Sequence, residues 1–402
     1  MTQLDGGHLD LRSGRAHTGA RPFPAEEYAT RVAAIRALMA EREIGTLCLV
    51  GPENICYLTG LDHQGFFAFT MLIVPTSGAL QVVTRAMERE TIAAQVPGCV
   101  HVPFADGASS AAAAAGAVRE ATAGDATVAV ELASNSLSVA VWRDLGLELA
   151  HWRLVDGSGL VESVREVKSP AEIGYVRDAA AISDRAVLAA VETVRPGVNE
   201  RDVAAVVYDA MIRAGGEYPG FVPLVRSRDI LLQEHVTWRD HVVTAGDAVF
   251  VELAGVVARY HAPMSRMIYL GDAPRGTDVA ATIALDGLEA VRSALAPGTT
   301  AAEVSGAWQG VVDAGLGHRH YRRHHCGYLT GIGFPPSWVG GSVVVGLRHD
   351  SDLTIRAGMV FHVLSWILDQ QPADYVISDT VLVTANGGEI LTTADRAPII
   401  KA

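Results

Sequence analysis

The chain has 402 residues, more than one ordinary domain, and its 49% hydrophobic and 19% charged residues allow two or three units with sizeable cores. A formal net charge of -13, with no lysine- or arginine-rich tract, argues against nucleic acid or an anionic membrane as the main partner, because either requires a basic surface. The 4 cysteines form no CxxC pair and no long apolar run occurs, so we expect a cytoplasmic chain with reduced thiols and no transmembrane helix.

In the first half of the chain, helical and strand-like patterns alternate. Residues 1–22 are polar and glycine-rich, without the apolar core of a signal peptide, which predicts a flexible arm. Residues 26–42 carry apolar side chains at three- and four-residue spacing and predict an amphipathic helix, and the alanine run 111–115 is typical of a helix. Short apolar runs predict buried strands at 46–50, 66–74, 80–83 and 127–130. The alternation indicates a small α/β domain over residues 23–160.

The second half starts with a clear helix signal. Ser169 can cap a helix, Pro170 suits its first position, and Glu172 falls in its first turn. We therefore place the domain boundary near residue 160 and the second domain at 161–402. Helical patterns cover 172–194, 200–214, 279–294 and 302–314, and strand patterns cover 248–253, 265–269, 359–366 and 379–384. The mixture predicts an α+β domain with paired helices and antiparallel strands.

Titratable side chains gather in this second half around one glutamate. Glu252 lies within the apolar strand VFVELAG, where a buried charge is costly unless it has a partner, although the alternation of the strand also permits a solvated position. Histidines at the nearby strands and loops favour proton transfer near neutral pH. These histidines are His235, His261, His324, His325 and His362.

Other polar residues are candidates for holding a substrate. Asp379 begins a strand pattern and, like Glu252, is either a buried carboxylate with a partner or a solvated one. The side chains of Tyr260, Arg266 and Trp338 are candidates for binding a ligand. A carboxylate of the substrate could be held by Arg226, Arg228 or Arg259, unless these arginines are simply exposed. The chain has no glycine-rich nucleotide motif, no GxSxG and no HExxH, so nucleotide binding and serine-hydrolase chemistry are unsupported.

Several segments, in this order, resemble the pita-bread family that includes creatinase, ectoine hydrolase, aminopeptidase P, prolidase and methionine aminopeptidase. They are NICYLTGLD, REVKSPAEIGYVRDAAAISDRA, VELAGVVARYHAPMSRMIYLG, GYLTGIGFPPSW, GMVFHVL and ISDTVLVT. The resemblance covers nearly the whole chain. It implies an α+β pita-bread catalytic domain preceded by a smaller α/β domain of the creatinase type.

The departures from the metal-dependent members are as informative as the matches. Those members hold two metal ions with two aspartates, one histidine and two glutamates, and leucine cannot replace any of these ligands. The five positions here are Glu252, His261, Tyr328, Leu364 and Ser378. The pattern therefore resembles creatinase and ectoine hydrolase, which work without a metal, and we expect neither metal nor cofactor. In that comparison His235 matches a proton-shuttle histidine and Glu252 the central glutamate.

The resemblance implies metal-independent hydrolysis of a C–N bond in a small polar nitrogen compound: a cyclic amidine, a lactam or a guanidino compound. Glu252 would attack the sp² carbon or activate a water, and His235 would pass a proton to the departing nitrogen. Residues expected to orient the substrate or stabilise its charge are His261, Tyr328, His362 and Asp379, together with Tyr260, Arg266 and Trp338. The resemblance further implies a homodimer, in which the aromatic stretch 66–69 could cover the partner's site.

Two other classes of function stay open at this point. One is a metal-dependent hydrolase or lyase with a rearranged site for one ion, built from Glu252, His261, His362 and Asp379. The other is a non-catalytic binding protein on the same fold.

Overall fold

The computed structural model describes residues 21–124, 126–318 and 320–402, and within them the chain forms two compact units. We call residues 21–166 with 341–343 the N-terminal unit, and residues 167–340 with 344–402 the C-terminal unit. The division follows Glu166 and not the predicted residue 160, because the short helix α6 (Glu162–Arg165) contacts α1 (Ala25–Glu41). Nearly all of the predicted arm lies outside the described residues. No helix in the described part of the chain is long and apolar enough to cross a membrane.

The N-terminal unit is built on a mixed six-stranded sheet in the order β4-β3-β2-β1-β5-β6. Strand β1 pairs antiparallel with β2 and parallel with β5. The strands are β1 (Ile44–Leu49), β2 (Met71–Pro75), β3 (Gln81–Arg85), β4 (Val100–Phe104), β5 (Thr127–Val130) and β6 (Leu154–Asp156). The remaining helices of this unit are α2 (Pro52–Thr59), α3 (Arg89–Gln95), α4 (Ser110–Ala121) and α5 (Val139–Glu148). This is the α/β architecture that the sequence predicted.

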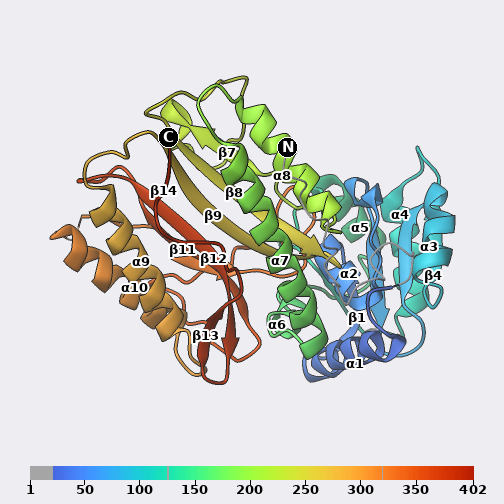
Figure 1. Ribbon diagram of the computed structural model, residues 1–402. Coiled ribbons are helices and arrows are strands. Elements are labelled where there is room, and N and C mark those ends of the chain that lie inside the picture. The colour runs from blue at the N-terminus through green and yellow to red at the C-terminus, as the bar shows by residue number, and fades with distance from the viewer. Residues whose placement is uncertain (1–20, 125, 319) are drawn as a thin grey trace. The chain divides into compact units, whose positions relative to one another are not determined.

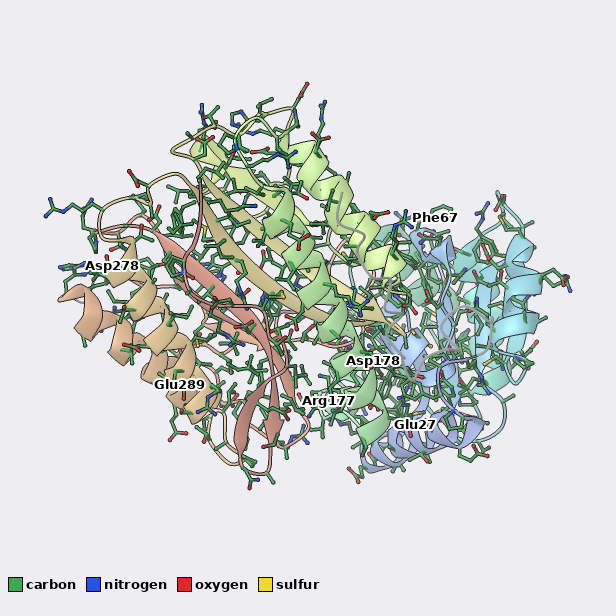
Figure 2. All side chains as sticks on the ribbon, in the orientation of Figure 1. Glu27, Phe67, Arg177, Asp178, Asp278 and Glu289 are labelled. Atoms are coloured by element: carbon green, nitrogen blue, oxygen red, sulfur yellow. The ribbon has the colours of Figure 1, made fainter. Side chains whose placement is uncertain are left out.

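One helix and one strand of this unit can be compared with their sequence predictions. The alanine run forms part of α4, whose small buried side chains contact the sheet at β2 and β3, as predicted. The predicted strand 66–74 is wrong in its first part, since Gln64–Phe67 is a 3-10 turn and β2 begins only at Met71. The Phe66 ring packs against His63, and Phe67, labelled in Figure 2, is 83% exposed. An apolar run therefore did not continue the strand, because its first side chains do not join the core.

The C-terminal unit holds an eight-stranded sheet with the path β10-β11-β12-β9-β8-β7, with β13 beside β12 and β14 beside β9. Its strands are β7 (Leu224–Ser227), β8 (Ala248–Val257), β9 (Tyr260–Leu270), β10 (Gly327–Leu329), β11 (Val360–Ile367), β12 (Tyr375–Thr384), β13 (Gly387–Ile390) and β14 (Ile399–Lys401). Its long helices are α7 (Pro170–Thr193), α8 (Glu200–Arg213), α9 (Thr277–Ala294) and α10 (Ala301–Leu316). Helix α7 packs on β8 and β9, α9 packs on β11 and β12, and each pairs with the helix that follows it (Figure 1).

The helix that opens this unit is fixed at its start and along its length. Ser169 and Glu172 form the reciprocal capping box at the first turn of α7, as their spacing predicted. Further along, the Ser183 hydroxyl accepts a hydrogen bond from the Gly255 amide of β8. A Cβ atom at Gly255 would lie 2.2 Å from the Ala179 carbonyl oxygen, so only glycine allows α7 to approach the sheet this closely.

The strand register brings four separate strands to one row of side chains. Glu252 of β8 is paired with Ser265 of β9, Ser265 with Ser378 of β12, and Ser378 with Leu364 of β11. Directly paired residues of antiparallel strands point to the same face of the sheet. The row therefore places Glu252 on the same face as side chains that are up to 126 positions later in the chain (378 minus 252).

Candidate active site

A cavity of about 330 Å³ opens in the C-terminal unit above this row of side chains. Its inner wall is apolar and aromatic, and its outer part carries charged and titratable groups. The inner lining includes Leu224, Glu252, Tyr328, Trp338, Leu364 and Trp366, and the outer lining includes Phe221, Glu234, His235, Arg323, His324, His325 and Arg348. A cavity of this size, with a few polar groups among apolar walls, is typical of a site for a small molecule.

Glu252 is the carboxyl group of the inner wall. Its side chain is buried, and burial raises its pKa to about 7, an effect that the negative charge of Glu234 increases and that Arg226 and Arg323 oppose. Within the described part of the chain its carboxylate accepts no hydrogen bond, and Nε2 of His362 lies 3.7 Å from Oε1. Glu252 is therefore a carboxyl group that changes charge near neutral pH and has capacity left for a ligand.

Beside Glu252, His362 lies within a chain of hydrogen bonds that crosses four strands, β10, β11, β12 and β9. The Trp338 indole Nε1 is 2.8 Å from the Tyr328 hydroxyl, and this hydroxyl is 2.8 Å from Nδ1 of His362. Nε2 of His362 is 2.7 Å from the Ser378 hydroxyl, which donates to Ser265. Burial lowers the pKa of His362 to about 3, and the neighbouring His325 adds to this effect. His362 is therefore a neutral imidazole.

The outer part of the cavity contains one ion pair and several basic groups. Glu234 and Arg323 form a bidentate ion pair with N–O distances of 2.8 and 3.1 Å. The His235 ring is exposed and stacks on Phe221, with ring centroids 6.2 Å apart. His235 thus lines the same cavity as Glu252, as the sequence predicted, but it lies at the mouth and not beside the carboxylate.

Sequence reasoning did not single out several lining residues: Phe221, Leu224, Glu234, Arg323, Arg348 and Trp366. The charged run HRHYRRHHC that precedes Tyr328 carried a signal for Arg323. The others lie in separate loops and strands that only the folded sheet brings together. Of these, Glu234 alone directly adjoins a residue that the sequence singled out, His235, and a linear pattern does not show that the others meet at one cavity.

Two residues predicted for the site are instead parts of the framework. His261 is completely buried, its Nδ1 donates to the Arg259 carbonyl at 2.9 Å, and its Nε2 accepts from the Gly220 amide at 2.8 Å. Both ring nitrogens are thus used by the backbone, and the register places His261 opposite Val256, four positions from Glu252 along β8. The Tyr260 hydroxyl donates to Glu172 at 2.6 Å, which ties β9 to α7. Neither side chain lines the cavity, so the structure places both of them in the framework and not at the candidate site.

Arg266 and Asp379 are also framework residues. Both are almost fully buried, and their ion pair has an N–O distance of 2.9 Å. The remaining Asp379 acceptors are filled by Thr392 and Arg396, at 2.6 Å each, and Arg266 also donates to four backbone carbonyls. Both oxygens of Asp379 and the whole guanidinium of Arg266 are thus engaged in this buried network, and neither side chain lines the cavity.

The three arginines considered for a substrate carboxylate are likewise engaged by other groups, and none of them lines the cavity. Arg226 is buried, donates to the Gln233 carbonyl and lies over the Phe250 ring. Arg228 pairs with Asp247, and Arg259 donates to the Gly333 and Tyr218 carbonyls. The arginines that line the cavity are Arg323 and Arg348.

The side chains around Glu252 do not fit a two-metal site. Leu364 offers no ligand atom, and both nitrogens of His261 are bound to the backbone. The same contacts do not fit a single ion held by Glu252, His261, His362 and Asp379, because both His261 nitrogens are bound to the backbone and the Asp379 carboxylate is bound by Arg266, Thr392 and Arg396. Across residues 21–124, 126–318 and 320–402, no group of three or more His, Cys, Asp or Glu side chains is arranged to hold a metal ion.

The chain was then compared with known proteins. The sequence profile of metallopeptidase family M24 matches residues 174–385, and that of the creatinase/prolidase N-terminal domain matches residues 31–167. Ectoine hydrolase from Halomonas elongata is 30% identical over 404 residues, which span 94% of this chain and 98% of that protein.

Solved structures agree on the fold. Dipeptidase PepE from Mycobacterium ulcerans superposes with a TM-score of 0.78 at 25% identity, over 94% of this chain and 99% of that one. A prolidase from Thermococcus sibiricus superposes with a TM-score of 0.83 at 21% identity, over 94% and 100% of the two chains. These likenesses confirm the predicted pita-bread fold with a creatinase-type N-terminal domain. The chain is thus a hydrolase-type protein that belongs to metallopeptidase family M24.

Proposed function

We propose that this chain hydrolyses a C–N bond in a small nitrogen compound, a cyclic amidine, a lactam or a guanidino compound, without a metal ion. The observation that carries the proposal is the cavity around Glu252. It holds one uncommitted carboxyl group beside a neutral imidazole, whereas the positions that bind metal in related enzymes offer Leu364 and hydrogen-bonded side chains. The similarity to an ectoine hydrolase over nearly the whole chain supports the same reading.

The proposed reaction uses the ionised form of Glu252. Its carboxylate takes a proton from a water molecule that adds to the sp² carbon of the substrate, so that an O–C bond forms and the C–N bond breaks. Alternatively, the carboxylate itself adds to this carbon and the C–N bond breaks; a water molecule then adds to the same carbon, breaks the bond to the Glu252 oxygen and restores the carboxylate. The departing nitrogen receives a proton from His235, whose exposed ring can exchange protons with solvent at the cavity mouth. The aromatic wall, including Tyr328, Trp338 and Trp366, stacks on a planar C–N group and keeps water away from it.

The outer part of the cavity suggests what else the substrate carries. Arg348 and Arg323 line the mouth, together with His324 and His325. Glu234 neutralises Arg323, and the exposed Asp350 partly offsets Arg348. A substrate that enters with its C–N group toward Glu252 would therefore present a carboxylate to Arg348, the less committed of the two arginines.

The proposal is tested with the purified full-length chain on ectoine, creatine, a lactam amino acid and an Xaa-Pro dipeptide, each with and without a chelator. We expect turnover of a non-peptide C–N substrate that survives chelation and is lost by at least about a hundredfold in Glu252→Gln. A matched control is Glu217→Gln, since Glu217 accepts backbone hydrogen bonds from Ala258 and Arg259 and does not line the cavity. Turnover of the dipeptide alone, abolished by the chelator, would refute the proposal.

A further inference from the structure

The hydrogen bonds around His362 have only one consistent direction. The Trp338 indole is a donor only, so the Tyr328 hydroxyl accepts from it at 2.8 Å. The remaining proton of that hydroxyl then points to the other neighbour, Nδ1 of His362, at 2.8 Å. Burial raises the pKa of the phenol, so the hydroxyl keeps this proton, and among the described residues Nδ1 is the one remaining hydrogen-bond partner that can accept it. In a neutral ring the single N–H is then on Nε2.

The other side of the ring agrees with this assignment. Nε2 lies 2.7 Å from the Ser378 hydroxyl, which gives its own proton to Ser265 at 2.8 Å and so accepts from His362. All of these side chains are buried, with exposed fractions of 0% for His362, Ser378 and Ser265 and 9% for Tyr328. Burial also keeps the ring unprotonated, since it lowers the pKa of His362 to about 3. Trp338, Tyr328 and Ser378 thus leave the ring only one tautomer that satisfies both nitrogens.

We propose that Trp338 and Tyr328 hold His362 as the neutral Nε2–H tautomer, and that this N–H, which is hydrogen-bonded to the Ser378 hydroxyl and lies 3.7 Å from the Glu252 carboxylate, makes His362 a positioning residue for Glu252. The proposal rests on the proposed function in one respect, that Glu252 is the reacting carboxylate. His362 contacts neither the cavity nor a substrate in it, since it does not line the cavity. Its predicted role in binding substrate is therefore replaced by a role that acts through Glu252.

The physical reason is the difference between an N–H and a lone pair at 3.7 Å from Oε1. The positive end of an N–H at this distance attracts the ionised carboxylate even though its hydrogen bond is to Ser378, whereas the lone pair of the other tautomer would repel the carboxylate and favour the protonated acid. A neutral donor also orients Glu252 without forming an ion pair that would quench its basicity. The charged groups that act on Glu252 from the neighbouring elements are Arg226, Glu234 and Arg323. None of them contacts the His362 ring, so they do not set its tautomer.

The tautomer can be observed directly by nitrogen NMR of the full-length chain labelled with ¹⁵N-histidine. The His362 signals are assigned by their loss in His362→Gln. We expect a pyrrole-type Nε2 and a hydrogen-bonded pyridine-type Nδ1. In Tyr328→Phe the Nδ1 signal should move to the position of a pyridine nitrogen without a hydrogen bond, and the ring should protonate at a higher pH. The control is Tyr269→Phe, which loses one hydrogen bond, to the Asp374 carbonyl, outside this cavity. A protonated Nδ1 in the natural chain, or an Nδ1 signal that Tyr328→Phe leaves in place, would overturn the assignment.

A pair of variants tests the effect on Glu252. The side-chain amide of glutamine can place an N–H close to Nε2, whereas that of asparagine places it close to Nδ1. We expect His362→Gln to keep at least about tenfold more kcat than His362→Asn, with similar KM, because the substrate does not touch this residue. Equal kcat in two folded variants would overturn the positioning role. If the chain turns over none of the C–N substrates, the proposed function fails while the nitrogen spectra still decide the tautomer, so the two failures are distinguishable.

Discussion

Oε1 of Glu252 lies 3.7 Å from Nε2 of His362, and both side chains are buried in the sheet of the C-terminal unit. The two groups belong to strands that are not neighbours, since β9 and β12 lie between β8 and β11. Burial changes them in opposite directions: it raises the pKa of the carboxyl group to about 7 and lowers that of the imidazole to about 3. Between these values the carboxyl is neutral or negative and the imidazole is neutral, so the pair does not form a conventional salt bridge.

The pH dependence of turnover should report the charge of Glu252. Because the reaction needs the carboxylate, kcat/KM should rise by about tenfold per pH unit below pH 7 and level off above it. Glu234→Gln removes a negative charge that raises the pKa of Glu252 and frees the Arg323 cation, which lowers that pKa. Both effects should move the midpoint of the profile to lower pH. The dependence of kcat/KM on pH is measured for the natural chain and the variant. An unchanged midpoint would show that a group other than Glu252 causes the rise of kcat/KM with pH.

The arginine at the mouth should affect binding and leave the chemical step unchanged. We expect Arg348→Gln to raise KM for a carboxylate-bearing substrate by about tenfold, with kcat within about twofold, because Arg348 is an exposed residue of the cavity lining whereas Glu252 is buried. Arg322→Gln is the matched control, since Arg322 is half exposed, pairs with Asp313 and does not line the cavity. Steady-state kinetics of the two variants decide the point: equal KM values would place the substrate carboxylate elsewhere.

Asp379 should prove to be a stability residue. Asp379→Asn leaves the buried Arg266 and the partly buried Arg396 without their charge partner, which should lower the free energy of unfolding by about 3–5 kcal/mol. Asp209→Asn removes only an exposed helical pair with Arg213 and should cost less than about 1 kcal/mol. Urea unfolding measures both. A higher KM for Asp379→Asn, with its stability unchanged, would instead support contact with the substrate.

A second buried carboxyl group, in the N-terminal unit, makes stability depend on pH. Burial raises the pKa of Glu131 to about 7, although the Val50 and Gly51 amides and the Asn54 side chain donate to its carboxylate. A pKa above the unfolded value means that the folded chain keeps a proton that the unfolded chain releases. This contribution to stability is complete below about pH 4.5 and is lost as the pH rises to about 7.

The size of this effect is on the order of 3 kcal/mol, from a pKa difference of about two and a half units. Glu131→Gln removes the titrating group, and rotation of the Asn54 amide can bring its oxygen, which has no partner among the described residues, to the new amide. We therefore expect the variant to lose less stability than the natural chain between about pH 5 and about pH 8 in denaturant titrations. The stability of Glu252→Gln is measured over the same pH range for comparison, because burial raises the pKa of Glu252 to about 7 as well. Parallel curves for Glu131→Gln and the natural chain would contradict this account.

Much of the fold could be predicted from local patterns. The capping box at Ser169, the amphipathic helices and the apolar strands of both units depend on neighbouring residues, so their signals lie within a few positions of each other. The predicted strand 66–74 failed because apolar character does not tell whether a side chain reaches the core: Phe67 is 83% exposed. The dimer and the cytoplasmic location remain predictions.

By itself, the sequence determined the two-domain α/β and α+β architecture. It also singled out Glu252 as a candidate site residue, because a carboxyl group within an apolar strand can be recognised from the sequence alone. Only the tertiary structure decided which polar residues meet it. The sequence pattern indicated His261, Arg266 and Asp379 as site residues. In the structure, His261 is hydrogen-bonded to the backbone, and Arg266 and Asp379 form a buried ion pair. Tyr328 and His362, with Ser378, meet beside Glu252 instead, because antiparallel register brings residues distant in sequence to one face, and pairing is set by the whole sheet.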